Sequence, residues 1–244
     1  MNARLVGLPQ AKFLYEGTST LKAKSTYVYD WGGEYLQNLS TASTQHGGGY
    51  STDFVVGRGN LVDVLRWDVT DPNNSGKALE SKMGYDIDGS VVFARDALNH
   101  QNSLIYGDSF SDGNNNRHTF AYPTTVTDAD GNSSYLQYNY DFGSKTRVQG
   151  PRPEGQTQGA IQTLAYDTAA RLQQVTNANN DAYAHYVYGP NYVQSYSTVN
   201  TVATNFYQAD LYAIQVFDGA GRVIGPQLLL ARNGETRVTF GLIQ

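Results

Sequence analysis

One short pattern recurs along this 244-residue chain and constrains its fold more than any other feature. A tyrosine or another aromatic residue is followed by aspartate and then, a few residues later, by glycine and a strand-like segment. Self-similarity of this kind indicates a repeat architecture. The residues that we assign to the structural repeat are Tyr29 and Asp30; Tyr85, Asp86 and Gly89; Tyr140, Asp141 and Gly143; Tyr166, Asp167 and Arg171; and Phe217, Asp218, Gly221 and Arg222.

Each unit has the chemistry of a β-hairpin. The aromatic residue ends one strand, and aspartate opens a tight turn because its carboxylate can accept a hydrogen bond from the backbone N–H two residues on. Glycine then supplies the positive φ that closes a turn with a bulge. Ala170 stands where the unit of Asp167 should have its glycine. We therefore predict a left-handed alanine there, and we expect Ala170→Gly to stabilise the fold.

Between the turns, the sequence alternates with the period of a β-strand and is rich in Val, Thr and Tyr. Good examples are residues 26–29, 135–140 and 183–188, while helical periodicity is nearly absent. We predict an all-β protein in which antiparallel hairpin repeats form one large curved sheet. We assign residues 1–244 to a single repeat domain with a weak internal boundary at 150–155, where Pro and Gly concentrate, and we interpret that segment as a long hairpin loop.

Composition excludes several classes of protein. The net charge is −5 and Lys and Arg form no cluster, which disfavours nucleic acid as a partner. Without cysteine the chain forms no disulfide and no thiolate metal site. No apolar run approaches the ~18 residues of a membrane-spanning helix. The N-terminal residues lack the apolar stretch of a signal peptide.

No catalytic or metal site stands out. The Asp-x-Asp-Gly segments at 86–89 and 128–131 contain oxygen ligands for calcium, but the further ligands and the distal glutamate of a calcium loop are missing, so we interpret both as turns. No Gly-x-Ser-x-Gly elbow is present. We expect no cofactor and no enzyme activity, although a distant carboxylate pair of the glycosidase type would be invisible in sequence. Four histidines lack the spacing of zinc ligands: His46, His100, His118 and His185.

The repeat resembles the RHS/YD-repeat family, whose units read approximately as tyrosine, aspartate, two residues, glycine, arginine and leucine. The segment at 217–223 matches this unit closely, and the segment at 166–172 matches it except at Ala170. A second aspartate-containing turn of the family is visible at 96–100 and at 127–132, and residues 58–67 also resemble sequence between family repeats. The resemblance covers about residue 4 to residue 225.

The resemblance implies a β-sheet array that winds into a hollow shell, which in bacterial members encloses a toxin. Related shells occur in insecticidal toxin complexes and in animal cell-surface adhesion proteins. We therefore expect a structural wall segment that is secreted or at the cell surface, with neighbouring YD-repeat segments or identical chains as partners through sheet edges and a toxin as the enclosed cargo. Because the chain is too short to close a shell and shows neither an aspartyl autocleavage core nor a toxin tail, we expect it to be a fragment or a stand-alone remnant of such an array.

Two alternatives remain open. The chain has nineteen tyrosines, and exposed aromatic rows beside polar side chains can stack on sugars, as in a carbohydrate-binding or adhesion module. The same rings are also explained as the cross-strand ladder of the repeat itself. A repeat array without caps leaves unpaired sheet edges, so a self-assembling protein that polymerises through these edges is the other alternative.

Overall fold

The computed structural model describes residues 7–31, 35–44, 57–198 and 211–224, together with the backbone of two strands near the C-terminus. The chain divides into two compact units, which we describe separately: unit 1 is Met1–Ser109 with Gly113–Ser134, and unit 2 is Phe110–Asp112 with Tyr135–Gln244. The described residues contain a single helical element, the short 3-10 turn η1 (Ser75–Lys77). No described helix is long and apolar enough to cross a membrane.

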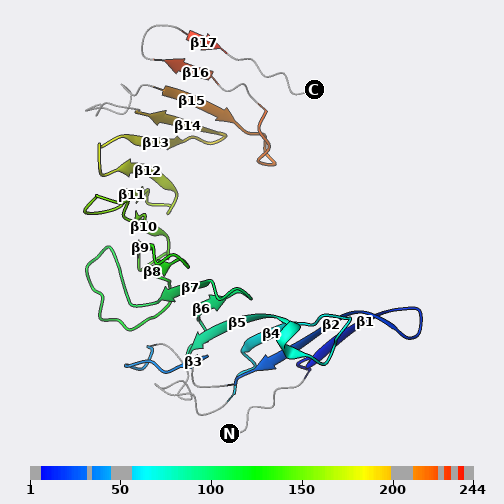
Figure 1. Cartoon of the computed structure of the whole chain (residues 1–244). Helices are drawn as coiled ribbons and strands as arrows, with labels where there is room; N and C mark the ends of the chain where they lie inside the picture. The colour runs from blue at the N-terminus through cyan, green and yellow to red at the C-terminus, as the bar shows by residue number, and fades with distance from the viewer. Residues whose placement is uncertain are drawn as a thin grey trace. The chain divides into compact units, whose positions relative to one another are not determined.

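Unit 1 is an antiparallel sheet with one short parallel addition (Figure 1). Its strands pair in the order β1–β2–β4–β5–β6–β7–β8, each antiparallel to the next, and β3 joins β5 in parallel. The bounds are β1 (Ala11–Glu16), β2 (Thr20–Tyr29), β3 (Leu36–Gln37), β4 (Leu61–Arg66), β5 (Leu79–Asp86), β6 (Val91–Arg95), β7 (Gln101–Ile105) and β8 (Thr125–Thr127).

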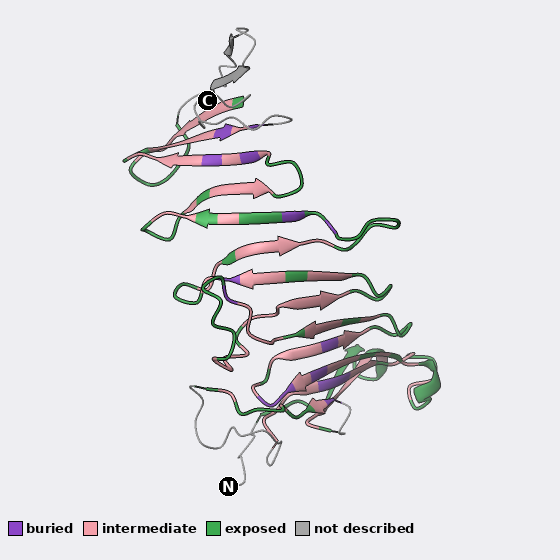
Figure 2. Ribbon diagram, turned by 90° about the vertical axis from the view of Figure 1, so that its left-hand side faces the viewer, coloured by how far each residue is buried: buried purple, intermediate pink, exposed green. Residues whose placement is uncertain are grey.

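Unit 2 is an antiparallel meander in which every strand pairs with the next along the chain. Figure 2 shows its strands side by side, joined by alternating loops. The first two residues of β9 belong to unit 1. The bounds are β9 (Ser133–Tyr138), β10 (Lys145–Gln149), β11 (Ile161–Tyr166), β12 (Leu172–Asn177), β13 (Tyr183–Tyr188), β14 (Tyr192–Ser197), β15 (Leu211–Val216), β16 (Leu228–Ala231) and β17 (Thr236–Val238).

The prediction of an all-β protein built from antiparallel hairpins is confirmed. Residues 183–188, expected as a strand from their alternating tyrosines, form β13. The Pro- and Gly-rich segment at 150–155 lies in the hairpin loop between β10 and β11, inside unit 2. The N–H of Gly150 donates to the carbonyl of Ala160 at 2.8 Å and closes the base of this loop. The assignment of residues 1–244 to one domain stays a prediction.

The buried core of unit 1 is small. Tyr35, Val62 and Phe93 form one cluster, in which the rings of Tyr35 and Phe93 lie 5.9 Å apart, and Ile87 is buried outside this cluster. Gly84 of β5 lies directly opposite Phe93 of β6, and a Cβ at Gly84 would overlap the Phe93 ring. The glycine therefore lets a large ring lie flat across the sheet, where Tyr35 covers it.

Buried side chains in unit 2 are spread along the sheet. Figure 2 shows them as short separate segments on some of its strands. The most buried apolar residues are aromatic or aliphatic side chains from four different strands and from the segment before β9: Phe110, Tyr138, Ile161, Tyr183 and Tyr196. Stability of this unit must therefore rest largely on contacts between neighbouring strands.

Candidate functional site

The recurring feature of both units is one turn geometry that aspartate opens. In each case the carboxylate Oδ1 accepts backbone N–H groups two and four residues on, at 2.8 to 3.0 Å. The N–H three residues on donates to the aspartate carbonyl, and the residue at that third position has positive φ. The five aspartates, each with its positive-φ residue, are Asp86 with Gly89, Asp96 with Asn99, Asp128 with Gly131, Asp167 with Ala170, and Asp218 with Gly221.

The expected hydrogen bond from aspartate to the N–H two residues on is thus present in these turns. Ala170 has φ +58°, so the prediction of a left-handed alanine is confirmed. An alanine in this conformation brings Cβ close to the backbone, a cost that glycine avoids. Asn99 is the other non-glycine residue at this position, and asparagine tolerates the left-handed region.

The arginine that follows two of these turns uses the second carboxylate oxygen. Arg171 Nε donates to Asp167 Oδ2 at 2.7 Å, and Arg222 Nε donates to Asp218 Oδ2 at 2.6 Å. Backbone and side-chain hydrogen bonds from these arginines lower the pKa of Asp167 and Asp218 below the ordinary value. Both carboxylates therefore stay charged and fully bonded, which explains why arginine suits this position of the unit.

The tyrosine before the turn ties its own strand to the preceding one. Four strand-end tyrosine hydroxyls donate to a backbone carbonyl at or just before the start of the neighbouring strand: Tyr29 to Pro9 at 3.2 Å, Tyr85 to Leu61 at 3.0 Å, Tyr166 to Lys145 at 2.8 Å and Tyr188 to Leu172 at 2.7 Å. Phe217 occupies the same position after β15 and has no hydroxyl. The tyrosine thus connects backward along the sheet, and the aspartate turn connects forward.

The predicted turn role of Asp141 is wrong, because this loop is one residue longer. Asn139 opens it, and its side-chain oxygen accepts the N–H of Asp141 at 2.8 Å and of Phe142 at 3.2 Å. Gly143 has φ +70° and donates to the carbonyl of Asn139 at 3.0 Å. Tyr140 therefore lies within the turn, two residues after the end of β9, and does not end a strand.

A second turn of this longer type follows β12, and sequence reasoning missed it. Asn177 opens it by accepting the N–H of Asn179 at 3.0 Å, and Asp181 takes the positive φ of +57°. In both longer turns the positive-φ residue comes four positions after asparagine, against three after aspartate in the shorter ones. Only in the first of these turns is the positive-φ residue a glycine, so only there does the sequence carry a signal that identifies asparagine as the opening residue.

Asp30 also departs from the predicted role. Its carboxylate accepts the N–H of Gly59 at 2.5 Å and the N–H of Asn60 at 3.0 Å. Asp30 itself has φ +51° and donates its N–H to the carbonyl of Asn60 at 2.9 Å. This residue therefore joins the end of β2 to the start of β4 instead of opening a local turn. Gly32, the expected glycine of this unit, lies outside the described residues.

Asp63 and Asp86 are the buried carboxyl groups among the described residues of unit 1, and Asp63 lies in a strand. It lies on β4 directly opposite Lys82 of β5, and only 8% of its surface is exposed. Burial, together with the hydrogen bond and negative charge of Glu80, raises the pKa of Asp63 to about 6. Lys82 lies 3.0 Å from Glu80 and opposes this shift only in part. Asp63 and Glu80 are thus two carboxyl groups beside one cation, Lys82. This arrangement favours the protonated form of Asp63.

The described histidines lie apart from one another. His100 Nδ1 lies 2.9 Å from Asp96 Oδ2 at a turn, and His185 Nδ1 of β13 lies 3.0 Å from Gln174 Oε1 of the neighbouring strand β12. Burial lowers the pKa of His185. His118 has φ +53° and its ring stacks on Phe120. Within the described ranges, no three His, Asp or Glu side chains form a group that could hold a metal ion. His46 lies outside these ranges.

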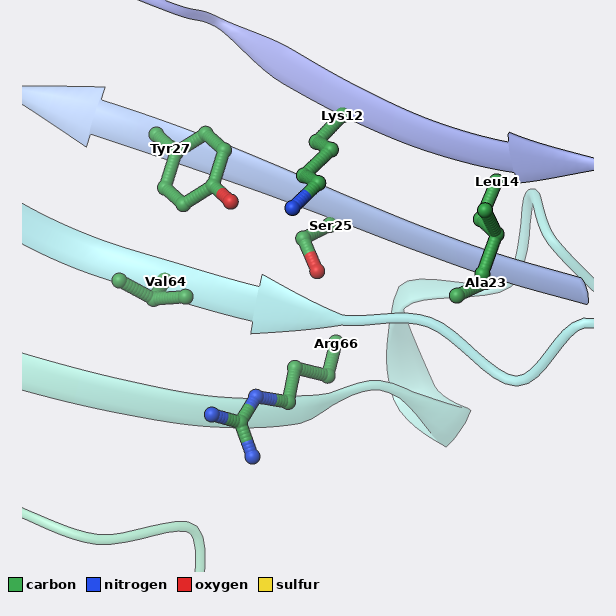
Figure 3. Close-up of a pocket in the computed structure, with 7 residues that line it drawn as sticks. All are labelled: Lys12, Leu14, Ala23, Ser25, Tyr27, Val64 and Arg66. Carbon is green, nitrogen blue, oxygen red and sulfur yellow. The ribbon is translucent and has the colours of Figure 1, made fainter.

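One face of the unit 1 sheet carries a hollow of about 360 Å³ (Figure 3). It lies over β1, β2 and β4, and its lining residues are Lys12, Leu14, Ala23, Ser25, Tyr27, Val64 and Arg66. Sequence reasoning did not predict it. Lys12 and Arg66 are far apart in the chain, and only the strand register places both of them opposite Ser25.

Comparisons with known proteins give structural similarity only. No family model matches the sequence, and none of the curated proteins matches it. A crystal structure of TcdB2-TccC3-Cdc42 is 16% identical, covers 84% of this chain and 10% of that chain, and has a TM-score of 0.42. A Tc holotoxin pore from Photorhabdus luminescens is 14% identical, covers 92% of this chain and 10% of that chain, and has a TM-score of 0.29.

A third structure, TcdB2-TccC3 without the hypervariable C-terminal region, is 17% identical, covers 93% of this chain and 10% of that chain, and has a TM-score of 0.31. The chain therefore spans about a tenth of the length of the solved chains it resembles. At these identities and TM-scores, the similarity assigns neither a function nor a partner to this chain.

Proposed function

We propose that this chain is a structural wall segment of an RHS-type β-sheet shell. The observation that carries the proposal is the two-way linkage of its strand-end units. At Tyr166, the hydroxyl bonds backward to β10, while Asp167 in the following turn bonds forward to the start of β12. The same arrangement occurs in unit 1. The Tyr85 hydroxyl bonds to the preceding strand β4, and the Asp86 carboxylate accepts a hydrogen bond just before the start of the following strand β6.

Linkage of this kind suits a wall. Each strand is held mainly by its two neighbours, so the sheet can extend by adding further units without a larger core. The small core of unit 1 and the dispersed buried residues of unit 2 agree with such a design. The proposed role is architectural, with no catalytic residue, and its residues are those of the strand-end units.

The finer proposal is containment. By its resemblance to the RHS/YD-repeat family, we infer that the segment contributes to a secreted or cell-surface shell that encloses a toxin or another effector. Neighbouring YD-repeat segments would continue the sheet at its edges, where backbone N–H and C=O groups are free to pair.

The test begins with the reading frame on both sides of the 244 codons. We expect further Tyr-Asp units and then a dissimilar tail. The product of the complete frame should then protect that tail from a protease until the shell is opened with denaturant. A frame that holds no further units, or a tail digested at the rate of an unfolded peptide, would contradict containment.

Self-assembly through sheet edges is the second candidate, and strand β1 favours it. Three consecutive large apolar side chains of β1 are exposed on both of its faces: Phe13 at 49%, Leu14 at 58% and Tyr15 at 51%. Among the described strands, β1 pairs only with β2, so its other edge offers unpaired backbone groups. Sedimentation of the chain over a range of concentrations tests this candidate. A monomer throughout that range would exclude it.

A further inference from the structure

The hollow on the unit 1 sheet is built by a contrast in side-chain size. The central strand β2 contributes the small residues Ala23 and Ser25 to its floor. In Figure 3 the side chains of Lys12 and Leu14 on β1 extend toward these two residues, and the side chain of Arg66 extends from β4 over the next strand. A volume of about 360 Å³ lies within the range of small-molecule pockets, ~300 to 1,000 Å³.

The floor and rim are arranged in register. Ser25 lies opposite Lys12 on one side and opposite Arg66 on the other, so the hydroxyl stands between two cations in one cross-strand row. With strands ~4.8 Å apart, the backbones of Lys12 and Arg66 are separated by about 10 Å. In the next row, Tyr27 lies opposite Val64. The hollow therefore combines two positive charges, two hydroxyls, one aromatic ring and aliphatic side chains.

The two cations are available to a ligand. Most other cations of unit 1 have recorded partners: Lys22 is 2.6 Å from Glu16, Lys82 is 3.0 Å from Glu80, and Lys24 lies over the Trp67 ring. Among the residues that the structure describes, neither Lys12 nor Arg66 has an ion-pair or hydrogen-bond partner, and none of the described lining residues is acidic. A local concentration of positive charge in a chain of net charge −5 favours an anionic ligand.

We propose that this hollow binds an acidic sugar residue of a glycan, a pyranose that carries a carboxylate or a sulfate. Lys12 and Arg66 would hold the anionic group from two sides, and the Ser25 hydroxyl would donate to it. The Tyr27 ring would lie against the sugar face, as aromatic side chains do with ligands that have one apolar side. The site is independent of the wall role, since it uses none of the strand-end residues.

The test is calorimetric titration of the full chain with a galacturonic acid trisaccharide. Its methyl ester serves as the neutral sugar of the same shape, and inorganic sulfate serves as the anion without a sugar. We expect the acidic trisaccharide to bind, the ester to bind about tenfold more weakly, and affinity to fall as salt rises. Chondroitin fragments with and without sulfate then distinguish a sulfate from a carboxylate as the bound group.

Variants assign the binding to this hollow. Lys12→Gln and Arg66→Gln should each weaken binding about tenfold, because each removes one charged hydrogen-bond donor. Lys22→Gln is the matched control: it makes the same change to a lysine of β2 that is already paired with Glu16, and affinity should stay within about twofold. All three variants alter exposed side chains, and circular dichroism confirms that they fold.

Three results would overturn the proposal. The first is no binding of either the acidic trisaccharide or the sulfated chondroitin fragment. The second is equal binding of the acid and its methyl ester, which would remove the role of the cations. The third is competition by inorganic sulfate as strong as that of the sugar, or a loss of affinity in Lys22→Gln equal to the loss in Lys12→Gln. Either would indicate a general attraction of anions to the chain. None of these results bears on the wall role, which the reading frame and proteolysis test separately.

Discussion

At the scale of single residues, the strand-end unit shows how much the backbone conformation depends on one side chain. In unit 2, Ala170 and Gly221 occupy the same position of two turns with the same hydrogen bonds, at φ +58° and +78°. The turn forms with alanine because Asp167 and Arg171 fix it from both sides. The hydrogen bonds of the unit therefore outweigh the strain of one left-handed alanine.

Ala170→Gly should consequently stabilise the chain by about 1 kcal/mol. Glycine relieves the left-handed strain, and this gain exceeds the extra chain entropy that glycine adds to the unfolded state. Urea denaturation of the two proteins, followed by a probe of unit 2, measures the difference. The reverse change, Gly221→Ala, is the matched control and should destabilise by a similar amount. A loss of stability in Ala170→Gly would contradict the assigned conformation.

At the scale of elements, the tyrosine hydroxyl is the link between neighbouring strands. Tyr188→Phe keeps the ring over Arg171, whose guanidinium lies 4.4 Å from the ring centre, and removes only the bond to the Leu172 carbonyl. We expect a loss of about 1 kcal/mol, the usual net value of one hydrogen bond. Tyr135→Phe is the control, since Tyr135 is 45% exposed and should change stability by less than about 0.5 kcal/mol.

Phe217 allows the same link to be added. In each of the four tyrosine hydrogen bonds, the accepting carbonyl belongs to the residue that lies across the strand pair from the residue just before the tyrosine. The residue just before Phe217 is Val216, which lies opposite Tyr192. The Tyr192 carbonyl is therefore the acceptor for a hydroxyl at position 217. Phe217→Tyr should therefore gain up to about 1 kcal/mol. Chemical denaturation of both variants checks the pair of predictions. A cost for Tyr188→Phe no larger than that of Tyr135→Phe would show that the hydroxyl does not link the strands.

Much of this element structure could be predicted from sequence, because it depends on local chemistry. The turns of Asp128, Asp167 and Asp218 follow from residues within five positions of one another. The partners of Asp30 could not be predicted, because Gly59 and Asn60 meet it only through the pairing of β2 with β4. The hollow was missed for the same reason: the neighbours of a residue across a sheet depend on register, which the sequence alone does not state.

At the scale of the whole molecule, two groups of carboxylates act in opposite directions on the dependence of stability on pH. The partly exposed turn aspartates Asp167 and Asp218 have lowered pKa values, so they stabilise the fold above their unfolded pKa and lose this effect as pH falls. Asp63 has a raised pKa of about 6, so its contribution is complete below the unfolded value of 3.8 and is lost as pH rises through about 6.

Asp63→Asn should therefore stabilise the chain most at neutral and alkaline pH. Asparagine has the shape of protonated aspartate and can still bond to Glu80, but it removes the cost of a buried charge. We expect a gain of up to about 3 kcal/mol above pH 7, the equivalent of a shift of ~2 pKa units, and little or none near pH 4. The free energy of unfolding of both proteins, measured by denaturation at a series of pH values, tests the gain above pH 7 and its absence near pH 4.

Asp68→Asn provides the control with the opposite sign. Asp68 is partly exposed on the loop after β4, and hydrogen bonds from the side chain and backbone of Thr70 lower its pKa. Its replacement should cost stability at neutral pH and little at acid pH, because the hydrogen bonds from Thr70 are stronger to the charged carboxylate than to a neutral acceptor. If the two variants showed the same slope against pH, Asp63 would be an ordinary ionised aspartate, and the sheet of unit 1 would hold its charge without penalty.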